Sequence, residues 1–156
     1  MSIRTAAEDF ANSYAAAMAI GPQSLDNTTK CASALASHYL ENFTSFTFGH
    51  IRTLPTGEDA VNGIDKHLQN FVKHGLGLDV RLKKSRVEVV SLSSALCWIT
   101  WELYPLDKSI EGWDWENVYS YRVRQDGKAG WESVISDNEI AGLTQRVPKF
   151  FEGYFG

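Results

Sequence analysis

Two features of this sequence could support chemistry through the types and spacing of their residues. The first is an aromatic and polar row at every second position, made of Trp113, Trp115, Asn117, Tyr119 and Tyr121. Alternate residues of a strand share one face, so the row is either an unusually aromatic core or the wall of a pocket for a large, flat molecule. The second is His50, which would share a strand face with Phe48. Because a histidine ordinarily titrates at roughly pH 6.5, His50 is a candidate general acid or base.

The rest of the chain carries no complete catalytic or cofactor-binding motif. It has no serine–histidine–aspartate set, no P-loop, no glycine-rich dinucleotide fingerprint and no HExxH. His38, His67 and His74 fall in expected helices without metal-ligand spacing, so no role is assigned to them. The two cysteines, Cys31 and Cys97, form no CxxC motif and are expected to be buried, reduced thiols. We therefore expect neither a metal nor a cofactor.

Composition narrows the class of protein and of partner. Of the 156 residues, 44% are hydrophobic and 22% are charged, as in soluble proteins that form one domain with one core. The formal net charge of −4 argues against nucleic acid as the main partner, because binding to phosphates needs a concentrated positive field. No apolar run approaches the ~18 residues of a membrane-spanning helix, and the N-terminal residues lack a signal-peptide pattern. We expect a cytoplasmic protein that does not bind membranes.

Hydrophobic periodicity changes from helical to alternating along the chain. Spacings of three and four residues predict helices over residues 3–19, 25–39 and 57–75, and a strand over 43–54 precedes the third helix. Alternation between turn signals then predicts strands over 78–90, 95–104, 113–124 and 130–138. A last helix, over 139–151, is interrupted by Pro148. This order predicts an α+β fold with helices against one face of a bent antiparallel sheet.

Three stretches carry a resemblance to a known superfamily. They read FANSYAAAM from Phe10, HYLENFTSFT from His38, and YRVRQDGKAGWESV from Tyr121. With this order of elements, the chain resembles the nuclear-transport-factor-2-like superfamily, which includes SnoaL-like polyketide cyclases, scytalone dehydratase, limonene epoxide hydrolase and ketosteroid isomerase. The resemblance implies one domain over residues 1–156. It also implies a cone-shaped, strongly bent antiparallel or mixed sheet, with three N-terminal helices packed on its concave face.

The resemblance also implies a site inside the cone. Proteins of this superfamily hold a small molecule there, so the aromatic row and Phe48 become expected substrate-binding residues, suited to an apolar or aromatic substrate. Tyr14 falls where ketosteroid isomerases carry a tyrosine that donates a hydrogen bond to a substrate oxygen. Asp137 falls where SnoaL-like cyclases and epoxide hydrolases of this fold place a catalytic aspartate. The isomerase's general base corresponds to Thr47, which cannot abstract a carbon-bound proton, so steroid isomerase chemistry of that type is not expected.

Two residues of the last expected strand could supply the catalytic acid, and they lie on opposite faces of that strand. Asp137 would share a face with Trp131, and Glu132 would lie on the opposite face, unless a bulge near Gly130 reverses the order. We favour Asp137. Glu102 is a third possible acid, with solvent exposure opposite a basic residue as the simpler interpretation.

These patterns lead to one functional hypothesis and one alternative. The hypothesis is a cofactor-independent proton-transfer enzyme, with Asp137, His50 and Tyr14 as catalytic residues. It would be a cyclase, isomerase, dehydratase or epoxide hydrolase acting on an apolar or aromatic small molecule such as a secondary metabolite. The alternative is a non-catalytic small-molecule-binding or assembly module of the same fold. The resemblance further implies a homodimer formed through the outer sheet face that bears Glu116, Val118 and Ser120.

Overall fold

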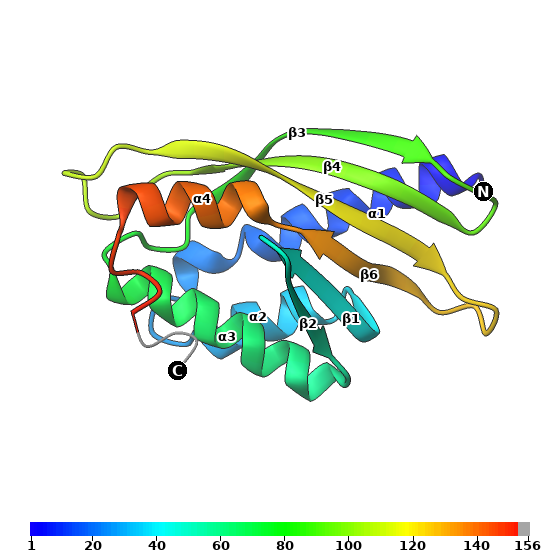
Figure 1. Ribbon diagram of the computed structural model, residues 1–156, viewed down its shortest axis with the longest axis horizontal. Helices are drawn as coiled ribbons and strands as arrows, with labels where there is room; N and C mark the ends of the chain where they lie inside the picture. The colour runs from blue at the N-terminus through cyan, green and yellow to red at the C-terminus, as the bar shows by residue number, and fades with distance from the viewer. Residues whose placement is uncertain (153–156) are drawn as a thin grey trace.

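The computed structural model describes residues 1–152. Two helices, a pair of strands and a third helix precede four consecutive strands and a last helix (Figure 1). The N-terminal part comprises α1 (Ile3–Met18), a 3-10 turn (Gly21–Gln23), α2 (Thr28–Ala36), β1 (Tyr39–Thr47), β2 (His50–Leu54) and α3 (Gly57–Lys73). The remainder comprises β3 (Val80–Val89), β4 (Ser94–Leu103), β5 (Trp113–Val123), β6 (Ala129–Ile135) and α4 (Asp137–Arg146). No helix within residues 1–152 is both long and apolar enough to cross a membrane.

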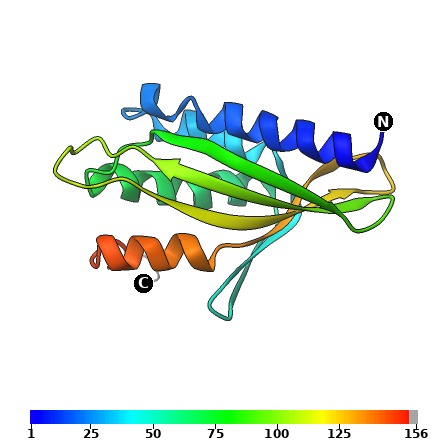
Figure 2. The same cartoon turned by 90° about the horizontal axis from the view of Figure 1, so that it is seen from above.

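The strands form one mixed sheet in the order β2-β1-β6-β5-β4-β3. Only the β1–β6 pair is parallel, and the other neighbours in this sheet are antiparallel. The sheet is strongly bent: Figure 2 shows the β1–β2 hairpin turned away from the long strands β3, β4 and β5. The three N-terminal helices pack on the concave side, and α4 contacts β5 from that side as well. The predicted α+β class and bent sheet are confirmed.

Local signals explain where the longest helices begin and end. The Ser2 side chain caps α1 by accepting a hydrogen bond from the Thr5 amide. Thr56 and Asp59 form a reciprocal capping box at the start of α3. Gly75 follows the end of α3 with φ of 78°, a left-handed conformation that glycine adopts at little cost. These ends match the sequence-based prediction for residues 3–19 and 57–75 within two residues at each end.

The predicted strand over residues 43–54 is wrong, because the structure forms a two-strand hairpin there. Phe48 and Gly49 make the turn, with φ of 49° and 81°. Two successive positive φ values fit the tight turns that join antiparallel strands. Such turns usually carry asparagine or aspartate before the glycine, whereas a bulky residue at positive φ is unusual. The Phe-Gly pair therefore gave no turn signal in the sequence.

Two other predicted boundaries also need correction. The second helix covers only Thr28–Ala36, and Tyr39 already belongs to β1. The strand predicted over residues 130–138 ends at Ile135, and Asp137 opens α4. An acid in the first turn is favourable, since it faces the positive end of the helix dipole. The last helix therefore begins two residues earlier than predicted. It ends at Arg146, because the residue before Pro148 is restricted to extended conformations.

An aromatic core joins α1 to the middle of the sheet. Trp131 has no exposed surface, and its ring lies 4.9 Å from Phe10, 5.7 Å from Tyr14 and 5.0 Å from Tyr119, measured between ring centroids. These contacts are mostly edge-on or tilted, the arrangements that aromatic rings prefer. The core therefore fixes α1 against β5 and β6, and with it the position of the Tyr14 hydroxyl.

Candidate functional site

A cavity of about 530 Å³ opens inside the concave side of the sheet. Helices α1, α2 and α3 form one side of it, the central strands form its floor, and the β1–β2 hairpin and α4 close the remaining sides. A volume of this size suits a molecule of one to three rings, because ligand pockets commonly measure a few hundred to roughly 1,000 Å³. Much of the lining surface is apolar, and polar side chains from β1, β2, β5, α3 and α4 also reach it.

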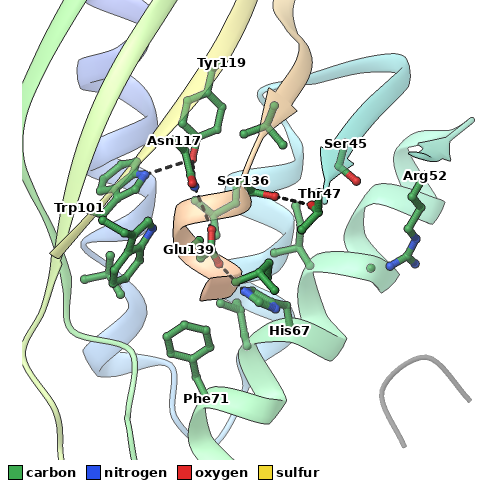
Figure 3. Close-up of a pocket in the computed structure, with 18 of the residues that line it drawn as sticks. Ser45, Thr47, Arg52, His67, Phe71, Trp101, Asn117, Tyr119, Ser136 and Glu139 are labelled. Atoms are coloured by element: carbon green, nitrogen blue, oxygen red, sulfur yellow. Dashed lines mark hydrogen bonds and ion pairs between the residues drawn. The ribbon is translucent and has the colours of Figure 1, made fainter. Parts of the chain in front are cut away.

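One end of the cavity holds a buried carboxylate between two polar partners (Figure 3). Glu139, in the first turn of α4, receives a hydrogen bond from Asn117 Nδ2 on its Oε1 at 2.8 Å. Its Oε2 lies 2.6 Å from His67 Nε2 of α3, with both side chains largely buried. Three elements that are distant in sequence therefore meet at one carboxyl group. We call Glu139, His67 and Asn117 the acid centre.

The acid centre keeps its carboxylate ionised at neutral pH. Burial alone would raise the pKa of Glu139, because a low-dielectric surrounding disfavours the charged form. The hydrogen bond and charge of His67, together with the Asn117 amide, outweigh burial and hold the pKa of Glu139 below its usual value. Asn117 is 2% exposed, and its Oδ1 has no hydrogen-bond partner among the described residues. That oxygen can accept a hydrogen bond from a bound molecule.

Three tyrosine hydroxyls lie in the same cavity. Tyr14 and Tyr39 share a hydrogen bond of 2.8 Å between their hydroxyl oxygens. The Tyr119 hydroxyl accepts hydrogen bonds from Trp101 Nε1 at 3.0 Å and from Asn117 Nδ2 at 3.4 Å. A shared hydrogen bond uses one of the two hydroxyl protons of the Tyr14–Tyr39 pair, and Tyr119 only accepts in its two bonds. Protons therefore remain for donation to a bound oxygen.

These hydroxyls are donors at any pH near neutrality. Burial raises the pKa of Tyr39 to about 12, and burial with the neighbouring tyrosines raises the pKa of Tyr14 well above its usual value. Burial likewise raises the pKa of Tyr119, with further contributions from Tyr39 and from the negative charge of Glu139. The carboxylate is thus close enough to act electrostatically on the hydroxyls. Cys31 also lines the cavity, but burial raises the pKa of its thiol to about 11, so it stays protonated.

A second side of the cavity is the inner face of the β1–β2 hairpin. Three cross-strand pairs face the cavity there: Phe43 with Leu54, Ser45 with Arg52, and Thr47 with His50. Directly opposed residues of an antiparallel pair have Cβ atoms about 5 Å apart, so each pair acts as one contact surface. The Thr47 hydroxyl also lies 2.7 Å from that of Ser136. We call Ser45, Thr47, His50 and Arg52 the hairpin wall.

Comparisons with known proteins identify the fold. No family profile matches the sequence, and a search of curated proteins found no significant match. Among solved structures, an NTF-2-like protein of unknown function from Shewanella oneidensis is 11% identical, with 82% of this chain and 96% of that chain covered and a TM-score of 0.57. An NTF2-like protein with a cystatin-like fold from Novosphingobium aromaticivorans is 13% identical, with 85% and 83% covered and a TM-score of 0.52.

The chain has the nuclear-transport-factor-2-like fold. The same fold is shared with the hexachlorocyclohexane dehydrochlorinase LinA-type3 from Novosphingobium barchaimii, which is 17% identical, with 85% of this chain and 86% of that chain covered and a TM-score of 0.57. At such low identity the likeness concerns the fold alone, so the function has to be argued from the cavity itself.

The nuclear-transport-factor-2-like fold brings most of the expected site residues together, but not all of them. Residues that line the cavity as expected are Tyr14, Phe48, His50, Trp115, Asn117 and Tyr119. Trp113 and Tyr121, at the two ends of the same row, do not line it. Tyr121 packs 5.2 Å from Phe10 under α1, and the ring of Trp113 lies under the Arg146 guanidinium of α4. The middle of the aromatic row therefore forms part of the cavity wall, whereas its two ends belong to the packed core.

The structure places Asp137 outside the cavity lining, contrary to its expected position. Its Oδ1 accepts a hydrogen bond of 2.9 Å from the backbone amide of Phe48, the residue with positive φ in the hairpin turn. Asp137 therefore stabilises the turn that carries the hairpin wall.

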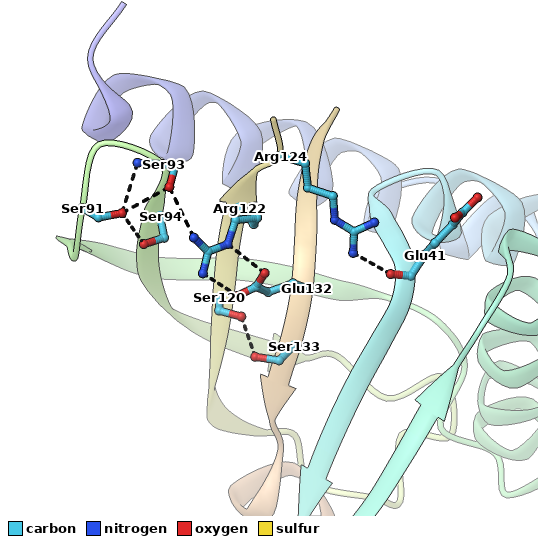
Figure 4. Close-up of polar contacts among 9 residues, drawn as sticks. All are labelled: Glu41, Ser91, Ser93, Ser94, Ser120, Arg122, Arg124, Glu132 and Ser133. Carbon is cyan, nitrogen blue, oxygen red and sulfur yellow. Dashed lines mark hydrogen bonds and ion pairs between the residues drawn. The ribbon is translucent and has the colours of Figure 1, made fainter. Parts of the chain in front are cut away.

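The two other candidate acids face outward. Glu132 is the extra residue of a bulge in β6, since Ser133 pairs with Ser120 while Trp131 pairs with Tyr121. Its carboxylate forms a two-pronged ion pair with Arg122 on the outer face, as Figure 4 shows. The bulge near Gly130, which the sequence left open, is therefore present. It puts Ser133 and Ile135 on the outer face with Glu132, and Val134 and Ser136 on the cavity side. Glu102 accepts a hydrogen bond from the exposed Tyr104 hydroxyl.

The acid centre contains two residues that the sequence analysis passed over. His67 and Glu139 are 72 positions apart, so nothing in the sequence joins them. A weaker signal was present in each helix. His67 stands three residues after Ile64 and four before Phe71, and Glu139 stands four before Leu143. A polar residue on the apolar stripe of a helix faces the interior and needs a partner there. Among residues 1–152 no cluster of metal-ligating side chains is present.

Proposed function

We propose that this protein is a cofactor-independent enzyme that moves a carbon-bound proton of an apolar or aromatic small molecule. The observation that carries the proposal is the acid centre: an ionised carboxylate, oriented by His67 and Asn117, inside an otherwise apolar cavity. An ionised carboxylate can act as a general base, even with a lowered pKa, when the site also stabilises the oxyanion that forms. Glu139 has the position and the protonation state for that role.

The proposed reaction uses the carboxylate of the acid centre and the tyrosine hydroxyls of the same cavity. A substrate with an acidic C–H bond next to a carbonyl group gives its proton to a Glu139 oxygen. The electron pair of that bond moves into the C–C bond to form an enolate, and the negative charge develops on the carbonyl oxygen. Hydroxyl protons of Tyr14, Tyr39 or Tyr119 are donors for that oxygen. Return of the proton to another carbon completes an isomerisation, and departure of a neighbouring group completes an elimination.

The proposal assigns different roles to the residues that the sequence analysis considered catalytic. Tyr14 keeps its role as a hydrogen-bond donor. His50 lies on the exposed rim of the hairpin wall, and Asp137 supports the turn next to it. In the proposal, Glu139 is the acid in the cavity, two residues after the expected Asp137. A dehydrochlorinase shares the fold, and removal of HCl from carbon is one reaction of this general kind.

Deuterium exchange into a simple ketone tests the proposal without knowledge of the natural substrate. 2-Tetralone is a two-ring ketone with acidic C–H bonds, and its exchange in D2O is followed by NMR at neutral pH. We expect exchange above the buffer rate with the wild type and exchange at least about 10²-fold slower with Glu139→Gln. If the wild type gives no acceleration while it binds the ketone, the alternative holds, and the cone is a non-catalytic binding module.

We also propose that two copies of the chain pair through the outer sheet face. An apolar row crosses that face in register, from Ile51 on β2 through Phe46, Ile135 and Val118 to Trp98 on β4. Ile51 is 69% exposed, Ile135 50% and Phe46 39%, which is unusual for neighbouring apolar side chains. A second copy of the same row would cover this surface. Sedimentation at micromolar concentration should show a dimer, and Ile135→Lys should shift it to a monomer; a wild-type monomer would refute the pairing.

A further inference from the structure

The hairpin wall has the composition of a binding site for an anionic group. It places one guanidinium, one imidazole and two hydroxyls on the cavity face of β1 and β2, as two adjacent cross-strand pairs. Figure 3 shows Ser45 and Arg52 at one side of the view, with Glu139 and His67 of the acid centre nearer its middle. We propose that the wall binds a carboxylate or similar anionic oxygen group of the substrate, whose apolar skeleton extends toward the acid centre.

Arg52 is the main reason for this assignment. Its side chain makes no hydrogen bond or ion pair with any residue in the described part of the chain, although it lines the cavity. A methyl group built on Gly63 of α3 would lie 3.4 Å from Arg52 Nη2, so the side chain extends from the hairpin to the helix across the cavity rim. A guanidinium is suited to this task because its planar donors match the two oxygens of a carboxylate.

The neighbours of Arg52 supply further hydrogen-bond donors for an anionic group. Ser45 is its direct cross-strand partner, and His50 stands two positions before it on the same face. The nearby acid Asp137 already accepts a hydrogen bond from the Phe48 amide and does not line the cavity. Other arginines on the sheet are paired instead: Arg81 with Asp79, Arg86 with Glu88 and Arg122 with Glu132. Arg52, which lines the cavity, therefore differs from these arginines because it has no ion-pair partner among the described residues.

Charge fixes the orientation of the substrate. The ionised carboxylate of Glu139 repels a second anion, whereas Arg52 on the hairpin attracts it. Much of the remaining lining is apolar and includes Phe43, Leu54 and Trp115. The substrate class is thus an apolar or aromatic skeleton with an anionic group at one end. The inference rests on the proposed function only in treating the cavity as a substrate site, and proton transfer is not required for it.

Two fluorescent probes separate the contribution of the anion from that of the rings. 8-Anilino-1-naphthalenesulfonate and N-phenyl-1-naphthylamine share the same ring skeleton, and only the first carries a sulfonate. We expect Arg52→Gln to weaken binding of the sulfonate by about tenfold, a typical loss for one charge-assisted contact, and to change binding of the neutral amine by less than about twofold. Wild-type binding of the sulfonate should also weaken from low to high salt, because the arginine is exposed.

Matched variants decide the outcome. Arg124→Gln removes a half-buried arginine that bonds to the Glu41 backbone and does not line the cavity, so it should leave both affinities unchanged. Arg52→Lys keeps the charge and should lose less affinity than Arg52→Gln. The proposal is overturned if the sulfonate does not bind, if both probes lose affinity equally in Arg52→Gln, or if Arg124→Gln has the larger effect. Because binding is measured, this result is independent of whether Glu139→Gln abolishes exchange.

Discussion

The acid centre and the hairpin wall lie in one cavity but differ in how their polar groups are satisfied. In the acid centre, both oxygens of Glu139 accept hydrogen bonds from the protein, and neighbouring tyrosines are bonded to each other or to Trp101. In the hairpin wall, Arg52 has no protein partner among the described residues and both His50 and Arg52 are exposed. Pre-organised, buried groups suit chemistry, whereas exposed groups with free donors suit recognition. This difference supports the proposal that the acid centre carries out the reaction and that the hairpin wall orients the substrate.

The largest expected effect comes from the carboxylate of the acid centre. Glu139→Gln keeps the size of the side chain but removes the proton acceptor, so the rate of 2-tetralone exchange should fall by about 10²-fold or more. Asp137→Asn is the matched control in the same helix turn, and exchange should stay within about threefold, since Asp137 does not line the cavity. If Asp137→Asn lost exchange and Glu139→Gln did not, the reaction would take place beside the hairpin and not at the acid centre.

A smaller loss is expected for the tyrosine donors. Tyr14→Phe and Tyr39→Phe each remove one hydroxyl from the cavity and should lower the maximal exchange rate by about 10- to 100-fold, as loss of one oxyanion donor does elsewhere. Affinity for the neutral naphthylamine should change little. Tyr121→Phe is the control, because Tyr121 is buried on the same strand as Tyr119 but outside the cavity. Equal losses in all three variants would indicate a packing effect.

The pH dependence of stability sharpens the comparison further. The folded-state pKa of Glu139 is below its ordinary value of 4.5. Its ionised form therefore stabilises the fold above that pH, and the contribution is lost as the pH falls through the lower, folded value. Urea unfolding between about pH 6 and pH 3 should therefore show a steeper loss of stability in the wild type than in Glu139→Gln. Parallel curves would mean that the acid centre does not hold its carboxylate in the charged form.

The smallest effect is expected at the hairpin turn. Asp137→Ala removes the acceptor of the Phe48 amide and should cost at most about 1 kcal/mol of unfolding free energy, since the bond is exposed. Amide hydrogen exchange of residues 48–50 should become faster while that of β4 and β5 is unchanged. Glu58→Ala, at an exposed position on α3, is the control and should leave the same amides unaffected. A global rise in exchange for Asp137→Ala would show that the turn supports the whole fold.

The sequence by itself determined the fold class and the middle of the pocket wall. Capping residues and apolar spacing placed α1 and α3, because such signals act between residues close in the chain. Alternation along β5 placed Trp115, Asn117 and Tyr119 on one face, since side-chain direction follows directly from strand geometry. Tyr14, which the resemblance of the first helix singled out, also lines the cavity.

Only the tertiary structure decided which acid enters the cone. Asp137 and Glu139 are two residues apart, yet one holds a turn of β1 and β2 and the other meets His67 of α3. That outcome depends on where β6 ends and α4 begins, and on the Phe48–Gly49 turn, which lacks a sequence signal. The contacts of the acid centre join residues up to 72 positions apart, and the relative placement of their elements is set by packing of the whole core. A local pattern contains no information about such distances.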